Sequence, residues 1–135
     1  MPRPELPEPI GQLLAKAAQD EYVLDKTLVD DDAPIEIYGF HAQQTAEKLL
    51  KAVLLGTKVV YPFTHRLTEL LDLGRSHGID FPEAFEELRY LTPFAVEFRY
   101  DVFPPEEEEP LDKAAVRKML KDLRHWVESF IQSNA

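Results

Sequence analysis

The chain has 135 residues, 44% of them hydrophobic, which suits one domain with one hydrophobic core. The absence of cysteine excludes disulfides, thiolate metal sites and a cysteine nucleophile, and no apolar run approaches the roughly 18 residues that span a bilayer. The net charge of −10 makes nonspecific DNA binding unfavourable, because an acidic surface repels phosphates.

Two amphipathic helices are predicted in the first half of the chain. The first covers about residues 6–28, and the second covers about residues 35–55. Their apolar residues recur with a period near 3.6, which is typical of a helix that packs one face against a core. Gly56 is expected to follow the second helix as its C′ residue.

Three further helical segments are predicted in the second half. They cover about residues 65–75, with Thr64 as N-cap, residues 82–90 with a short piece after Pro93, and residues 111–132 with Asp112 as N-cap. Residues 101–110 are expected to form an acidic, Pro-rich loop, because three prolines forbid a helix there.

The fold that these elements predict is all-α. No alternating strand pattern competes with the helices, and short connections favour antiparallel neighbours. We therefore expect a single domain over residues 1–135. It should form an antiparallel four-helix up-and-down bundle with a short additional helix.

The second predicted helix begins with polar residues that a core helix does not need. His41, Gln43 and Gln44 lie in its first turns, and paired amides offer donors and acceptors together. Positions 40, 44, 47, 48 and 51 share one side of this helix at helical spacing. One interpretation is a ligand patch that includes Lys48. The other, which we favour because buried polar groups are usually satisfied structurally, is a buried amide network or a dimer interface.

Other candidate residues lie along the chain. His41 and His65 could exchange protons near neutral pH, although His65 could equally support the start of the third helix. Arg99 and Tyr100 could hold a phosphate or a base, or Arg99 could pair with a nearby carboxylate. A basic stripe on the last helix is interpreted as a solvated face and consists of Lys113, Arg117, Lys121 and Arg124. No histidine or acid spacing indicates a metal site, and no cofactor is expected.

Three segments together resemble one protein family. They are FHAQQTAEKLLKA at residues 40–52, YPFTHRL at residues 61–67, with a Pro-x-Thr-His-x-Leu pattern, and LTPFAVEFRY at residues 91–100. With the order of the helices, they are similar to the HEPN domain family, in its small stand-alone prokaryotic type. The resemblance implies an antiparallel helical bundle that usually dimerises. A cytoplasmic location is expected separately, because the first five residues lack the apolar core of a signal peptide.

The resemblance also implies an activity and a partner. Many members are metal-independent ribonucleases, often toxins, paired with a minimal nucleotidyltransferase as antitoxin. Their signature is an arginine followed after four to six residues by a histidine. Arg99 has the expected place of the arginine, but the histidine positions hold Pro104, Pro105 and Glu106.

Because the signature histidine is missing, we consider three expectations for function. We favour a HEPN protein without the ribonuclease reaction, which binds a nucleotide, RNA or a nucleotidyltransferase partner. The first alternative is an active ribonuclease that combines Arg99 with a nonstandard histidine, His65 or His125. The second is an interaction protein with no small ligand.

Overall fold

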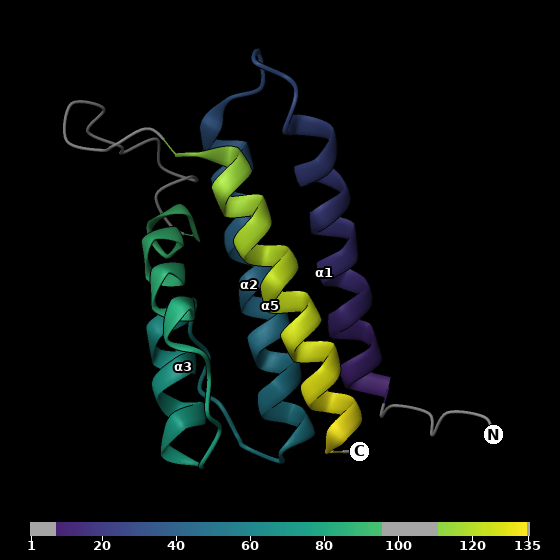
Figure 1. The fold of residues 1–135 in the computed structure, drawn as a ribbon, viewed down its shortest axis with the longest axis vertical. Coiled ribbons are helices and arrows are strands. Elements are labelled where there is room, and N and C mark those ends of the chain that lie inside the picture. Colours follow the sequence, from purple (N-terminus) through teal and green to yellow (C-terminus); the bar gives the residue numbers. More distant parts are fainter. Residues whose placement is uncertain (1–7, 96–110, 135) are drawn as a thin grey trace.

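The computed structural model describes residues 8–95 and 111–134, and every regular element in these ranges is helical (Figure 1). This confirms the all-α class. The elements are α1 (Glu8–Thr27), α2 (Ile35–Gly56), α3 (Leu67–Ser76), the 3-10 helix η1 (Glu83–Leu91) and α5 (Lys113–Ser133). The predicted loop at residues 101–110 lies outside the described residues. None of the described helices is long and apolar enough to cross a bilayer.

Two of the three predicted helix-end residues play other parts in the structure. Asp112 caps α5 as expected, since its carboxylate accepts from the backbone N–H of Ala115 at 3.1 Å. Thr64 does not cap α3, which starts after Arg66. The first backbone N–H of this helix, that of Leu67, donates instead to the distant hydroxyl of Thr92 at 3.2 Å. Gly56 lies inside α2, so it is not the C′ residue.

The described helices do not form the predicted up-and-down order. The start of α2 meets the start of α5, where Tyr38 donates to the Lys113 carbonyl at 3.1 Å, and Gly56 faces Ile131 at their other ends. These two helices are therefore parallel, and α1 runs antiparallel to both (Figure 1). Figure 1 also shows α3 running in the same direction as α2. This is possible because the connection at residues 57–66 returns along α2 instead of turning tightly.

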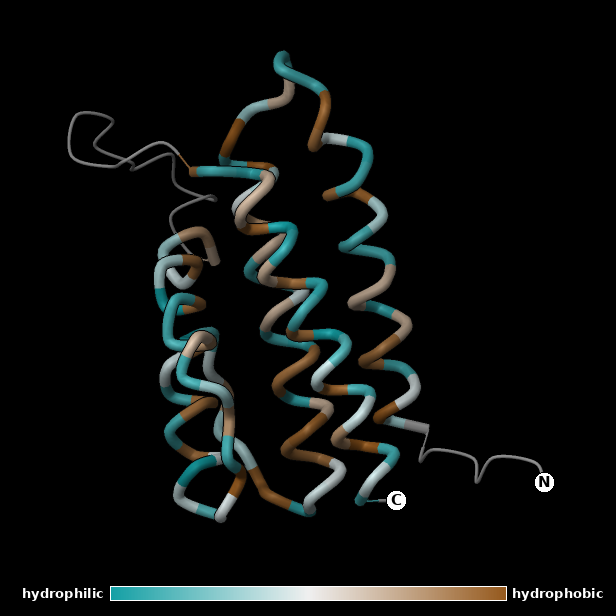
Figure 2. The backbone as a smooth tube through the Cα atoms, viewed as in Figure 1, coloured by the Kyte–Doolittle hydropathy of each residue, from teal (hydrophilic) through white to brown (hydrophobic). Residues whose placement is uncertain are grey.

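Helix α2 is the centre of the molecule and packs against α1, α3, η1 and α5. Figure 2 shows hydrophobic residues on the inward sides of the helices and hydrophilic residues at the loop between α1 and α2. An aromatic group completes the core beside α5. Trp126 lies 5.1 Å from Phe81, 5.8 Å from Phe85 and 5.1 Å from Phe130, measured between ring centroids.

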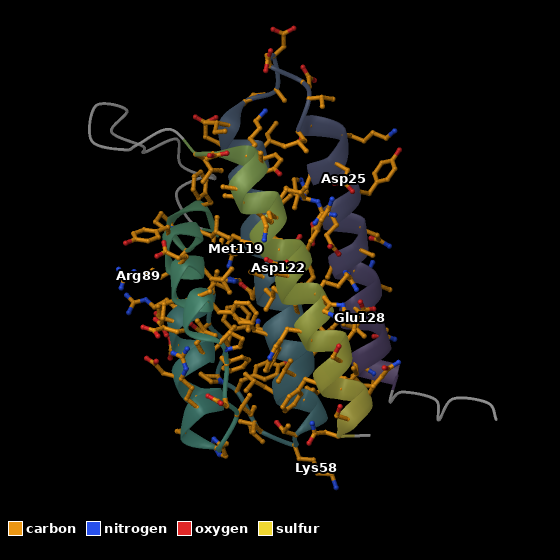
Figure 3. The ribbon with its side chains drawn as sticks, viewed as in Figure 1. Asp25, Lys58, Arg89, Met119, Asp122 and Glu128 are labelled. Atoms are coloured by element: carbon orange, nitrogen blue, oxygen red, sulfur yellow. The ribbon has the colours of Figure 1, made fainter. Side chains whose placement is uncertain are left out.

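The basic stripe of α5 binds α1 and is not a solvated face. Arg117 is buried and donates to Asp25 at 2.6 Å and to Glu21 at 3.2 Å. The hydrogen bond from Arg117 lowers the pKa of Asp25, whose side chain lies on α1 in Figure 3. Arg124 also donates to Glu21, at 2.6 Å, and Lys113 donates to the Thr27 carbonyl at 3.0 Å. Three of the four basic residues therefore form hydrogen bonds to α1.

Candidate functional site

The connection at residues 57–66 places a histidine beside the polar start of α2. Lys58 has a positive φ of 60°, which turns the chain at the end of α2. Residues 57–66 then return along α2 far enough for the His65 carbonyl to accept from Gln43 Nε2 at 3.0 Å. His65 thus lies near Gln43, 22 positions earlier in the sequence.

A buried carboxylate holds the His65 ring from the α2 side. His65 Nδ1 lies 2.8 Å from Glu47 Oε1, and the Gln43 amide donates to the same oxygen at 2.9 Å. Lys51 donates to the other oxygen of Glu47 at 2.9 Å. Gln43 and Glu47 are one helical turn apart, so this half of the cluster is built by local helix geometry.

A second group of the same kind lies at the interface with α1. Asp20 accepts from Lys48 at 2.6 Å, and its other oxygen lies 2.9 Å from His41 Nδ1. Gln44 links the two groups, because its Nε2 donates to Gln43 Oε1 at 2.7 Å and its Oε1 accepts from Lys48 at 3.3 Å.

The resulting polar network contains two carboxylates, two lysines, two histidines and two glutamines. Its members are Asp20, His41, Gln43, Gln44, Glu47, Lys48, Lys51 and His65. Burial acts to raise the pKa of Glu47, but hydrogen bonds from Gln43, His65 and Lys51 outweigh it and leave the pKa below its usual value of 4.5. Glu47 is therefore ionised at neutral pH, and the charges of the carboxylates and lysines balance.

One edge of the network is open to solvent. Gln44, Lys48 and Lys51 are partly exposed along one line of α2, which we call the α2 seam. Near the C-terminal end of the α2 seam, a groove of about 420 Å³ lies between α1 and α2. Apolar residues and Tyr61 line this groove together with Lys16 and Lys48. Lys48 therefore belongs to both the network and the groove.

Aromatic side chains flank the seam. Lys51 Nζ lies 5.4 Å from the centroid of the Tyr61 ring, a cation–π arrangement. The Phe63 ring meets His65 edge-on at 5.3 Å and is 92% exposed. A cation beside one ring, with a second ring exposed nearby, suits ligands that carry both phosphates and bases.

The structure joins five of the seven predicted site residues. His41, Gln43, Gln44, Lys48 and His65 all belong to the network, and Gln43 forms the buried amide network that we favoured. Arg99 and Tyr100 lie outside the described residues. In the described ranges, no three His, Asp or Glu side chains are grouped as metal ligands.

Sequence reasoning missed Asp20 as a member of the network. It lies on α1, and no motif in the sequence marks it. Its burial opposite His41 and Lys48 comes only from the packing of α1 on α2. The helical spacing of α2 did place Glu47 and Lys51 with the polar patch, although Glu47 proves to be buried.

The family model of the HEPN domain matches residues 13–131. The chain belongs to the HEPN domain family. No curated protein and no solved structure gives a significant match. The whole polar network, from Asp20 to His65, lies inside the matched HEPN region. Membership of this family indicates a function related to nucleotides or RNA.

Proposed function

We propose that this HEPN protein binds a nucleotide or RNA along the α2 seam. The observation that carries the proposal is the position of Lys48, which the network fixes at the rim of the groove. Asp20 and Gln44 hold the ammonium group, so little side-chain freedom is lost when a ligand binds. The volume of about 420 Å³ lies in the range of small-molecule sites.

The lining of the groove fits the two parts of a nucleotide. Lys16 and Lys48 offer ammonium groups for a phosphate, and Tyr61 offers a ring against which a base can stack. A protein of net charge −10 has no general attraction for nucleic acid. Binding must therefore depend on this local group of cations.

A titration with labelled single-stranded RNA and with nucleotides tests the proposal. We expect Lys48→Gln to weaken binding at least about tenfold, because a charge-assisted hydrogen bond contributes about 1.5–3 kcal/mol. The matched control is Lys118→Gln, since Lys118 pairs with Asp122 on the exposed side of α5. We expect the control to bind like the native protein. Absence of binding to every nucleotide and RNA tested would overturn the proposal.

The proposed binding module acts with a minimal nucleotidyltransferase in a toxin–antitoxin-like system. Val60 and Phe63 support a protein partner, because both are more than nine-tenths exposed on the connection after α2. Co-expression with a small nucleotidyltransferase encoded beside the gene should give a stable complex. Phe63→Asp should weaken that complex, and Tyr90→Asp on η1 should leave it intact.

We also propose a homodimer, as the HEPN family implies. Light scattering of the purified protein should then give twice the chain mass of 15.5 kDa. A single-chain mass at all concentrations up to about 100 μM would contradict the homodimer. The dissociation constant would then exceed about 100 μM, which is weaker than is typical of stable interfaces.

The ribonuclease alternative has one observation in its favour. The buried Glu47 holds His65 in a fixed orientation, as an acid–base group requires. RNA incubated with the protein and a chelator distinguishes the two functions. Our preferred proposal expects no cleavage. Robust cleavage that disappears in Arg99→Ala would overturn the preferred proposal of binding without cleavage and support the ribonuclease alternative.

A further inference from the structure

His65 is held at three points, yet one of its ring nitrogens is open. Glu47 binds Nδ1, Gln43 binds the backbone carbonyl, and the Phe63 ring packs edge-on against the imidazole. Nε2 has no hydrogen-bond partner among the described residues, and 37% of the side chain is exposed. The protein therefore presents an imidazole of fixed orientation to the solvent.

The charges around His65 leave its protonated form uncompensated. Glu47 already accepts from Lys51, so the pair is neutral before the imidazole gains a proton. On α3, Glu69 accepts from the Thr64 hydroxyl at 2.8 Å. Arg66, the residue after His65, adds a further positive charge to this segment. No titratable side chain of η1 contacts His65 among the described residues. Protonation thus adds a positive charge beside the seam.

We propose that the α2 seam binds its phosphate-bearing ligand together with one proton, which His65 carries on Nε2. The inference rests on the proposed binding of nucleotide or RNA. In a protonated imidazole both nitrogens donate, so Nδ1–H donates to Glu47 while Nε2–H donates to a phosphate oxygen. Ligand and proton then favour each other by linkage, and affinity rises as the pH falls.

The probe should carry phosphates that do not titrate themselves. A short 2′-O-methyl RNA without terminal phosphates meets this need, because a terminal phosphate has a second pKa of about 6. The 2′-O-methyl group also prevents cleavage through the 2′-hydroxyl. Calorimetry in buffers of different ionisation enthalpy gives the number of protons taken up. We expect net proton uptake on binding, and affinity that rises as the pH falls, by no more than about tenfold per pH unit, which is the limit for one proton.

Two variants assign the proton. His65→Gln should abolish the uptake and flatten the pH dependence. His77→Gln, at the exposed end of α3, should behave like the native protein. Circular dichroism should first establish that each variant is folded, and the calorimetry of the native protein remains decisive if His65→Gln is not.

The outcomes separate this inference from the proposed function. Binding without proton uptake would overturn the role of His65 and leave nucleotide or RNA binding standing. Uptake that persists in His65→Gln but disappears in His41→Gln would assign the proton to the Asp20 pair instead. Absence of binding at any pH would overturn both proposals.

Discussion

Gln43 joins more members of the polar network than any other uncharged side chain. Its Nε2 donates to Glu47 and to the His65 carbonyl, and its Oε1 accepts from Gln44. The side chain is completely buried. These partners also fix the orientation of the amide, because only one assignment of its oxygen and nitrogen satisfies all three.

Gln43→Ala should lower the free energy of unfolding by about 2 kcal/mol, since it leaves buried acceptors without their donor. Urea denaturation followed by circular dichroism measures the change. Gln19→Ala is the matched control, because Gln19 is exposed on α1. We expect it to stay within about 0.5 kcal/mol of the native protein. Equal effects of the two substitutions would show that the amide network contributes nothing to stability.

Glu47 should make the stability depend on pH on the acid side. A carboxylate whose pKa is lowered in the folded state stabilises the protein above its unfolded pKa, and this contribution is lost as the pH falls through the folded value. The pKa of Glu47 is lowered from 4.5, so native stability should decline below about pH 4.5.

Thermal denaturation between pH 7 and pH 3 tests the role of Glu47. Glu47→Gln should be less stable than the native protein at pH 7, with a shallower decline in acid. Glu128, which Figure 3 shows on α5, provides the control. Its carboxylate is exposed, and its contact with Arg124 is long, at 3.9 Å. If Glu47→Gln follows the same acid profile as the native protein, Glu47 is not the source of the decline.

At the scale of elements, two glycines should respond to alanine with opposite signs. A Cβ on Gly39 of α2 would collide with the Phe94 ring, whereas a Cβ on Gly11 of α1 would meet no atom within 4 Å. Gly39→Ala should destabilise the protein by about 1–3 kcal/mol through overpacking. Gly11→Ala should stabilise it by about 0.5–1 kcal/mol, because alanine loses less backbone entropy in a helix.

Denaturant titrations of the two glycine variants give these free energies directly. A neutral Gly39→Ala would mean that Phe94 can leave its place against α2 without cost. A destabilising Gly11→Ala would mean that the surroundings of Gly11 on α1 include a contact that alanine disrupts.

The helix ranges could be predicted, but their directions could not. The apolar period of α2 and α5 marks each helix locally, and the predicted bounds of α1, α2, α3 and α5 differ from the observed ones by two residues or fewer. The direction of α3 depends on where residues 57–66 run. Packing of these residues along α2 decides that path, and nothing in the sequence of the connection itself marks it.

At the scale of the whole molecule, we expect the acidic net charge to confine any RNA contact to the α2 seam and the adjoining groove. In Figure 3, Arg89 and Lys58 point away from the bundle, and Arg89 contacts Tyr90 beside it. We therefore expect few phosphate contacts, made by Lys16, Lys48 and Lys51. Three contacts predict a slope of about −2 in a plot of log affinity against log salt concentration for single-stranded RNA.

Fluorescence anisotropy at a series of salt concentrations measures this slope. Lys48→Gln should reduce its magnitude by about 0.7, the share of one contact, and Lys118→Gln should leave it unchanged. A slope steeper than about −5 would require a basic surface larger than the seam.

The sequence alone determined the helical class, the family resemblance and five residues that prove to share one network. Each follows from local chemistry: apolar spacing identifies a helix, and paired amides beside a histidine mark an unusual polar turn. Only the tertiary structure shows that Asp20 belongs to the network and that His65 contacts Glu47 of α2. It also shows that basic residues of α5, such as Arg117, form ion pairs with α1. Those features join residues far apart in the chain, so they depend on how whole helices pack and not on any local pattern.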